Sequence, residues 1–350
     1  PLTNSIYALP GNPGTGEQID ISATDNEAIL EFAKEKEIGL VVVGPEIPLT
    51  NGLVDELESA GIRAFGPRAN AAEIEGSKSF AKDLMKKYGI PTARYEVFTE
   101  AEPARAYIRR EGAPIVVKAD GLAAGKGVIV AMSEQEALDA VNAIMEDNSF
   151  GDAGARVVIE EFMEGEEASL LAFTDGKTIR PMISAQDHKR AFDGDKGPNT
   201  GGMGTYAPAP VMTPEMIDRA TEEILKPTLA AMAKEGRPYS GCLYLGLMIT
   251  EEGPKVVEFN ARFGDPETQV VLPLLDGDLI QIMCACADGT LADVPIHWKD
   301  GAAVCVVLTA GGYPASYEKG NEIHGIADAE KTGALVFHAG TAEKEGKLVT

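Results

Sequence analysis

The stretch Val117-Lys-Ala-Asp-Gly-Leu-Ala-Ala-Gly-Lys-Gly-Val128 decides the fold of the central part of this chain. It continues the apolar run that begins at Pro114 and leads into a second apolar run, Val128-Ile-Val-Ala131. The predicted order is therefore strand, glycine-rich turn, strand. A P-loop or a dinucleotide-binding motif continues from its glycines into a helix, so neither motif fits this context.

The composition of this turn indicates an anion site. Gly121, Gly125 and Gly127 allow backbone N–H groups to approach a ligand closely, and Lys118 and Lys126 add positive charge. We expect a polyphosphate to bind here. A flexible hairpin with solvated lysines is the alternative that this segment alone leaves open.

Farther along the chain, a predicted strand ends in Val256-Val-Glu258-Phe-Asn260-Ala-Arg262. Side chains two residues apart share a face of a strand, so Glu258, Asn260 and Arg262 are expected to point the same way. Carboxylate and amide oxygens suit Mg²⁺, and an arginine offers a planar fork to a carboxylate or phosphate. The polar loop Gly264-Asp-Pro-Glu-Thr-Gln269 follows at once, which favours a site over a merely solvated strand face.

Between these two motifs lies a polar stretch without periodicity, Gln186–Arg190 and Gly197–Tyr206. Long loops of this kind are usually functional or disordered. Glycines on both sides of Asn199 and Thr200 suit a backbone that wraps around a small polar ligand. The chain shows neither the residue order of a hydrolytic triad nor the spacing of zinc ligands.

The flanking regions indicate a multidomain α/β chain. Alternating short apolar strands and helices up to about residue 67 are typical of a doubly wound parallel sheet, with one helix expected over residues 49–60. A second helix is expected over residues 71–88. A new apolar strand from Ala302 begins a further, incomplete domain.

The composition excludes several classes of protein. The 350 residues include 31 basic and 55 acidic side chains, a net charge of −24, which argues against nucleic-acid coating or binding to an anionic membrane. Apolar runs such as Cys242–Ile249 are far shorter than the roughly 20 residues that span a bilayer. Four cysteines without a CxxC pair are expected to be free thiols in a reducing compartment.

The motifs as a set resemble the phosphoribosylamine–glycine ligase family of the ATP-grasp superfamily. The resemblance rests on residues 117–128, Asp187-His-Lys-Arg190, Gly197-Pro-Asn-Thr-Gly-Gly-Met-Gly204 and residues 258–269, with Pro10-Gly-Asn-Pro-Gly-Thr15 and Gly44-Pro-Glu46 nearer the start. It implies an α/β and α+β multidomain chain. The expected parts are an N-terminal doubly wound substrate domain at 1–77, an ATP-grasp domain at 78–287 and a partial C-terminal domain at 288–350.

The resemblance also implies a reaction. ATP, glycine and 5-phosphoribosylamine would give glycinamide ribonucleotide, ADP and phosphate through a glycyl phosphate, in de novo purine synthesis. The implied cofactors are ATP and Mg²⁺ or Mn²⁺. We expect a cytoplasmic monomer or weak oligomer with no nucleic-acid or membrane partner.

Site residues follow from the same resemblance, position by position. ATP is expected to meet Lys78, Lys118, Gly121, Gly125, Lys126, Gly127, Glu160, Glu161, Phe162 and Glu167. Glycine and phosphoribosylamine are expected to meet Asp187, Lys189, Arg190, Asn199, Thr200, Gly201, Arg262, Asp265 and Glu267. Arg262, Lys118 and Asp187 are the catalytic candidates, and Glu258 and Asn260 are the metal ligands.

Two alternatives remain open at this point. One is another ATP-grasp carboxylate–amine ligase or a carboxylase-type enzyme. The other is a nucleotide-binding fragment without turnover, because the Gly-Gly-Arg-Glu-His type motif that opens the family does not precede Ile6 and the family continues beyond Thr350. We therefore expect a piece of a longer chain.

Overall fold

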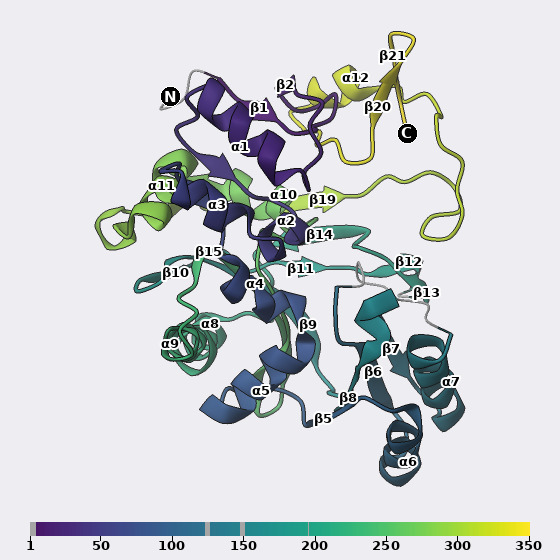
Figure 1. Ribbon diagram of the computed structural model, residues 1–350. Coiled ribbons are helices and arrows are strands. Elements are labelled where there is room, and N and C mark those ends of the chain that lie inside the picture. The colour runs from purple at the N-terminus through teal and green to yellow at the C-terminus, as the bar shows by residue number, and fades with distance from the viewer. Residues whose placement is uncertain (1–4, 123–126, 148–150, 195) are drawn as a thin grey trace.

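The computed structural model describes residues 5–122, 127–147, 151–194 and 196–350 (Figure 1). In the N-terminal segment two short parallel strand pairs form, β1 (Tyr7–Ala8) with β2 (Glu17–Gln18) and β3 (Val41–Val42) with β4 (Ala64–Phe65). Helix α1 (Asn26–Glu35) connects the two pairs. The prediction of a single helix over residues 49–60 is wrong. This segment forms two helices, α2 (Glu46–Thr50) and α3 (Leu53–Ser59), because Gly52 adopts φ +85° and interrupts the helical backbone between them.

The helix expected over residues 71–88 is also interrupted, so that prediction of one continuous helix is wrong. Two helices, α4 (Ala69–Gly76) and α5 (Lys78–Tyr88), are separated by Ser77, whose backbone is extended. The Ser77 hydroxyl accepts a hydrogen bond from the Phe80 N–H and so caps α5. Lys78 is therefore the first residue of a helix rather than part of a continuous one.

The glycine-rich hairpin belongs to a four-stranded antiparallel sheet of order β5-β8-β6-β7. Its strands are β5 (Tyr95–Phe98), β6 (Ile115–Ala119), β7 (Val128–Ala131) and β8 (Val157–Glu161). Helices α6 (Ala101–Glu111) and α7 (Glu134–Met145) cover it, and Ile108, Val141 and Ile144 fill the core between helices and sheet. The strand–turn–strand prediction is confirmed by the antiparallel pairing of β6 with β7.

A second four-stranded sheet, of order β10-β9-β15-β16, carries the other half of the site. It comprises β9 (Glu166–Asp175), β10 (Ile179–Pro181), β15 (Ser240–Thr250) and β16 (Gly253–Asn260). Leu243 and Leu245 on β15 pack into the cluster that includes α8 (Pro214–Arg219), the π-helical turn Ala220–Leu225 and α9 (Lys226–Lys234). The alternate residues Cys242 and Tyr244 face the cluster formed with α11 (Leu279–Asp288). Both faces of this sheet are thus buried.

The aperiodic stretch expected to be a loop contains four strands instead. They are β11 (Gln186–Asp187), β12 (Arg190–Phe192), β13 (Lys196–Asn199) and β14 (Gly204–Ala207). β14 pairs with β11 on one side and with β19 (Ala303–Val306) on the other, so main-chain pairing with a distant segment orders a sequence that has no periodicity. Local sequence could not reveal that partner.

The remaining elements lie mostly in the C-terminal part of the chain (Figure 1). They are α10 (Thr268–Val271), β17 (Leu275–Asp276), β18 (His297–Trp298), α12 (Ile326–Glu330), β20 (Ala342–Lys344) and β21 (Lys347–Val349). In Figure 1 this C-terminal segment lies beside the N-terminal one. No helix in the described ranges is both long enough and apolar enough to span a bilayer.

Candidate active site

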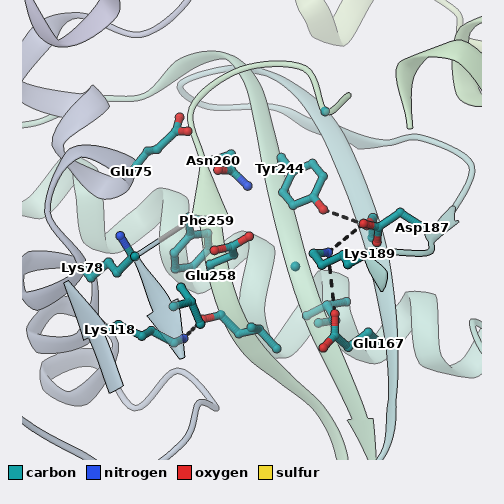
Figure 2. A pocket seen from close by; sticks show the side chains of 18 of the residues that line it. Glu75, Lys78, Lys118, Glu167, Asp187, Lys189, Tyr244, Glu258, Phe259 and Asn260 are labelled. Carbon is teal, nitrogen blue, oxygen red and sulfur yellow. Dashed lines mark hydrogen bonds and ion pairs between the residues drawn. The ribbon is translucent and has the colours of Figure 1, made fainter. Parts of the chain in front are cut away.

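A cavity of about 640 Å³ is lined by residues of both four-stranded sheets and of helix α5 (Figure 2). Its volume is within the range of small-molecule sites. One part of the lining is apolar and includes Val116, Val130, Phe162, Leu247 and Met248. Such a lining suits the flat, apolar faces of a nucleobase.

The cavity gathers most of the side chains that the sequence motifs selected. Those among its lining residues are Lys78, Lys118, Gly127, Glu160, Glu161, Phe162, Glu167, Asp187, Lys189, Asn199, Thr200, Gly201, Glu258, Asn260, Arg262, Asp265 and Glu267. Gly121 and Arg190 are not among the lining residues, and Gly125 and Lys126 lie outside the described residues. Segments more than a hundred positions apart in sequence are therefore neighbours in space.

Gly121 and Arg190 have other contacts. A Cβ on Gly121 would lie 2.9 Å from the Ala153 Cα, so close chain packing requires a glycine there. The Gly121 carbonyl accepts a hydrogen bond of 3.0 Å from the Lys78 ammonium. Arg190 is exposed and donates to the Gly197 carbonyl across the β12–β13 pair, at 2.8 Å.

A buried charge cluster lies along one side of the cavity. One Glu160 carboxylate oxygen is 2.9 Å from the Lys118 ammonium, and the other is 3.0 Å from that of Lys82. Burial would by itself raise the pKa of Glu160, but the two ammonium groups outweigh it and lower that pKa. Burial lowers the pKa of Lys82 to about 8, although Glu160 opposes the shift. The sequence interpretation missed Lys82; its position four residues after Lys78 on one helix face was the available signal.

Glu258 and Asn260 lie on β16, as predicted, and a β-bulge precedes them. Gly246 on β15 is opposite Glu258 whereas Leu247 is opposite Val256, so Val257 is the extra residue. The Val257 carbonyl accepts a hydrogen bond of 3.1 Å from Lys118. The bulge thus connects the strand of the expected metal ligands to the lysine of the other sheet.

The donor set at Glu258 and Asn260 fits a magnesium-type ion. The described residues contain no group of three or more histidine, cysteine, aspartate or glutamate side chains able to hold a metal. A carboxylate and an amide oxygen leave the remaining positions to water and phosphate oxygens, which is how Mg²⁺ is commonly bound at nucleotide sites.

Arg262 connects the site to the N-terminal segment. Its guanidinium lies 3.2 Å from the Glu75 carboxylate and 3.5 Å from that of Glu46, and it donates to the Asn260 amide oxygen at 3.4 Å. Burial raises the pKa of Glu75 to about 7, with Arg262 and the Ala261 N–H acting in the opposite direction. Glu75 was another residue that sequence analysis missed, because nothing in its local pattern distinguishes it from other helical glutamates.

The opposite wall of the cavity carries a second ionic group (Figure 2). The Lys189 ammonium is 2.8 Å from Asp187 and 3.7 Å from Glu167. Burial would lower the pKa of Lys189, but these carboxylates together with Glu258 raise it. This wall can therefore hold a charged lysine beside carboxylates, an arrangement suited to a small zwitterion.

Glu267 is held on the same side by neutral hydroxyl donors. Its carboxylate accepts hydrogen bonds from the Tyr244 hydroxyl at 2.9 Å and the Ser169 hydroxyl at 3.1 Å. Burial and the nearby Asp187 carboxylate raise the pKa of Glu267. The carboxylate is thus fixed in direction within the wall.

Two sheets with a nucleotide-sized cavity between them, a buried lysine on one sheet beside two on helix α5, and metal-type ligands on the other sheet define an ATP-grasp protein. Comparison with known proteins supports this class. Three domain models of phosphoribosylglycinamide synthetase match this chain: the N domain matches residues 1–75, the ATP-grasp (A) domain residues 76–268 and the C domain residues 303–350.

Similar curated proteins are phosphoribosylamine–glycine ligases. The chain is 56% identical to the phosphoribosylamine–glycine ligase of Brucella melitensis over 100% of this chain and 82% of the relative. It is 53% identical to that of Haemophilus influenzae, covering 100% and 83%. The chain therefore belongs to the phosphoribosylamine–glycine ligase family, the ATP-dependent ligases of purine biosynthesis, and the resemblance, fold class and enzyme class inferred from the motifs are confirmed.

Solved structures extend the comparison. The phosphoribosylamine–glycine ligase of Thermotoga maritima matches with a TM-score of 0.85 and 37% identity, over 98% of this chain and 83% of that one. A biotin carboxylase from Campylobacter jejuni matches with a TM-score of 0.67 and 18% identity, over 85% and 66%. The second likeness concerns the fold alone. Membership of the ATP-grasp family implies use of ATP and a divalent metal in general terms.

Proposed function

We propose that this chain joins glycine to 5-phosphoribosylamine at the cavity between the two sheets, with ATP converted to ADP and phosphate. The observation that carries the proposal is the meeting of Lys78 and Lys118 with Glu258, Asn260 and Arg262 around one cavity. Phosphoryl transfer requires positioning and charge neutralisation more than covalent participation of the protein, and these groups supply both.

The nucleotide would occupy the side of the cavity lined by α5, β6 and β8. Its base would contact the apolar wall near Phe162 and Glu161, and Glu167 would accept hydrogen bonds from the ribose hydroxyls. Lys78 and Lys118 would contact the phosphate chain, beside the glycine-rich turn between β6 and β7. The carboxylate of Glu160 would orient the Lys118 ammonium, because one of its oxygens lies 2.9 Å from that group.

Glu258 and Asn260 would hold a divalent cation, Mg²⁺ or Mn²⁺, which neutralises charge on the phosphates when bound. The bulge at Val257 supports this assignment, since bulges redirect side chains next to active sites. The residues of the chain would then fix the γ-phosphate near the acceptor.

The acceptor substrates would occupy the wall formed by β11, the β13–β14 segment and the loop after β16. The glycine carboxylate attacks the γ-phosphate, ADP leaves, and the amine of phosphoribosylamine then attacks the acyl phosphate and displaces phosphate. Arg262 would stabilise charge on the reacting carboxylate and Asp187 would orient an ammonium group. Other cavity-lining residues would complete the contacts: Lys189, Asn199, Thr200, Gly201, Asp265 and Glu267.

The chain would divide into an N-terminal domain at 1–77, an ATP-grasp domain at 78–287 and a C-terminal part at 288–350. It would act as a monomer or weak oligomer. It would work in the cytoplasm.

The test measures ADP release from MgATP with glycine alone and with glycine plus phosphoribosylamine generated in the cuvette. We expect release that requires both substrates, and none from a Glu258→Ala variant. Release that bicarbonate or another carboxylate supports equally well would contradict the substrate assignment. Binding of ATP without release under any condition would favour a nucleotide-binding fragment instead.

A further inference from the structure

Lys82 is a buried cation that the proposed function does not employ. Its side chain is 3% exposed and lies on α5, one turn after Lys78, so the two side chains share a helix face. Its ammonium donates to the Thr92 hydroxyl at 2.8 Å and contacts Glu160 at 3.0 Å, and the ring centroid of Tyr95 is 5.9 Å away. An ammonium group has three N–H donors, and this one has a hydroxyl and a carboxylate as direct partners, although Lys82 is also among the residues that line the cavity.

Lys118 also has two direct partners. Its ammonium forms an ion pair with Glu160 at 2.9 Å and donates a hydrogen bond of 3.1 Å to the Val257 carbonyl, so these two partners engage at most two of its three donors. It lines the cavity on the same side as Lys78 (Figure 2). Its third donor is therefore available to a phosphate oxygen.

Glu160 joins the two lysines. Val116 on β6 pairs with Glu160 on β8, which places Lys118 diagonally across from Glu160 on the same sheet face. Each carboxylate oxygen has one ammonium partner, Lys82 on one side and Lys118 on the other. If Lys82 were neutral, the free oxygen would attract Lys118 and turn its ammonium away from the cavity.

Lys82 is also connected to β16, the strand that carries Glu258 and Asn260, through Thr92. The Thr92 hydroxyl, which accepts from Lys82, donates to the Val256 carbonyl at 2.7 Å. Val256 and Val257 immediately precede Glu258, and their two carbonyls are held by Thr92 and Lys118 respectively. Lys82 thus supports the bulge through Thr92 and through the Glu160–Lys118 pair.

The cluster also has an electrostatic consequence. Two ammonium groups and one carboxylate carry a net charge of +1 within the protein, beside the cavity that would take a polyphosphate. Without the Lys82 charge the remaining pair is neutral. A single charge within about 8 Å of a phosphate changes the interaction enough to alter affinity about tenfold or more in a medium of intermediate polarity.

We propose that Lys82 is a positioning residue for the nucleotide: through Glu160 and Thr92 it holds the Lys118 ammonium and the bulge of β16 in the orientation that receives the triphosphate and its metal. The KM measurements that test this inference rest on the proposed function, because they require turnover. The Kd for MgATP can be measured without turnover.

The experiment compares Lys82→Met with Lys86→Met, which removes an exposed lysine from the next turn of the same helix. For Lys82→Met we expect the KM and Kd for MgATP to rise about tenfold or more, with the KM for glycine unchanged. Lys86→Met should change neither constant. Lys82→Arg should recover most of the ATP affinity, because it keeps a charged donor next to Glu160.

Two further variants test the route. In a Glu160→Gln background, Lys82→Met should lower MgATP affinity by a smaller factor than in the wild-type background, because the effect transmitted through Glu160 is already lost while the charge of Lys82 and its Thr92 contact are not. Thr92→Val, which leaves every charge in place, should weaken metal-dependent ATP binding and serves as the test if Lys82→Met does not fold.

An unchanged MgATP affinity in folded Lys82→Met would overturn the inference. So would equal increases in the constants for ATP and glycine, which indicate a general loss of structure. If the wild-type chain binds MgATP but shows no glycine-dependent turnover, the proposed function fails while the Kd comparison still tests Lys82.

Discussion

The substitution Glu258→Ala tests the metal assignment most directly. Glu258 is half-buried, lines the cavity and is absent from the ion pairs found among the described residues. Its removal should therefore change the free energy of unfolding by no more than about 0.5 kcal/mol. The same change removes the only carboxylate of the two expected metal ligands.

The expected loss of activity follows from Coulomb's law. A unit charge pair at about 4 Å, in surroundings of intermediate polarity, interacts with about 4 kcal/mol, which corresponds to a factor of about a thousand in affinity or rate. Glu258 also raises the pKa of Lys78, whose burial lowers it, so the variant should lower that pKa further. Both effects weaken the hold on the triphosphate.

The assay titrates Mg²⁺ at fixed ATP and follows ADP release, with urea unfolding of the same samples as the check on folding. Glu251→Ala, an exposed glutamate in the turn between β15 and β16, is the matched control and should behave like wild type. If Glu258→Ala folds and its ADP release depends on Mg²⁺ as in wild type, Glu258 is not a metal ligand. The metal would then have to bind elsewhere, because one amide oxygen from Asn260 is not sufficient to hold it.

Three other predictions follow from the same geometry. In Gly246→Ala the new Cβ would lie 3.2 Å from the Glu258 Cγ, so we expect weaker Mg²⁺ dependence and a loss of about 1–3 kcal/mol in unfolding free energy; unchanged Mg²⁺ titrations would contradict this. Phe173→Ala removes a fully buried ring that contacts two other phenylalanines, and urea unfolding should show a loss of about 3–5 kcal/mol; a much smaller loss would mean that the core closes around the gap. Burial lowers the pKa of Lys82 from 10.5 to about 8 in the folded protein, so between these values the unfolded chain binds more protons and the stability of wild type rises with pH. Relative to Lys82→Met, unfolding measured at pH 7 and 9.5 should show wild type gaining at most about 1.4 kcal/mol per pH unit; a difference independent of pH would contradict the shift.

Much of the fold was predictable because its signals are local. The hairpin of β6 and β7 and the strand β16 follow from short apolar runs and turn residues, which are visible within a few positions of the sequence. The breaks at Gly52 and Ser77 were missed. A glycine with positive φ and an N-capping serine are common in sequence, and only packing decides whether they end a helix.

The candidate site divides in the same way. The motifs alone show which chemical groups are present: the lysines and glycines of one hairpin, and a carboxylate and an amide two residues apart on one strand. The partners of these groups depend on how the chain folds. The tertiary structure placed Glu160 between Lys82 and Lys118, directed the Val257 carbonyl at Lys118 through a bulge, and connected Arg262 to Glu46 and Glu75. The physical reason is that a charge in the interior is stable only beside a compensating partner, and that partner is chosen by proximity in space rather than in sequence.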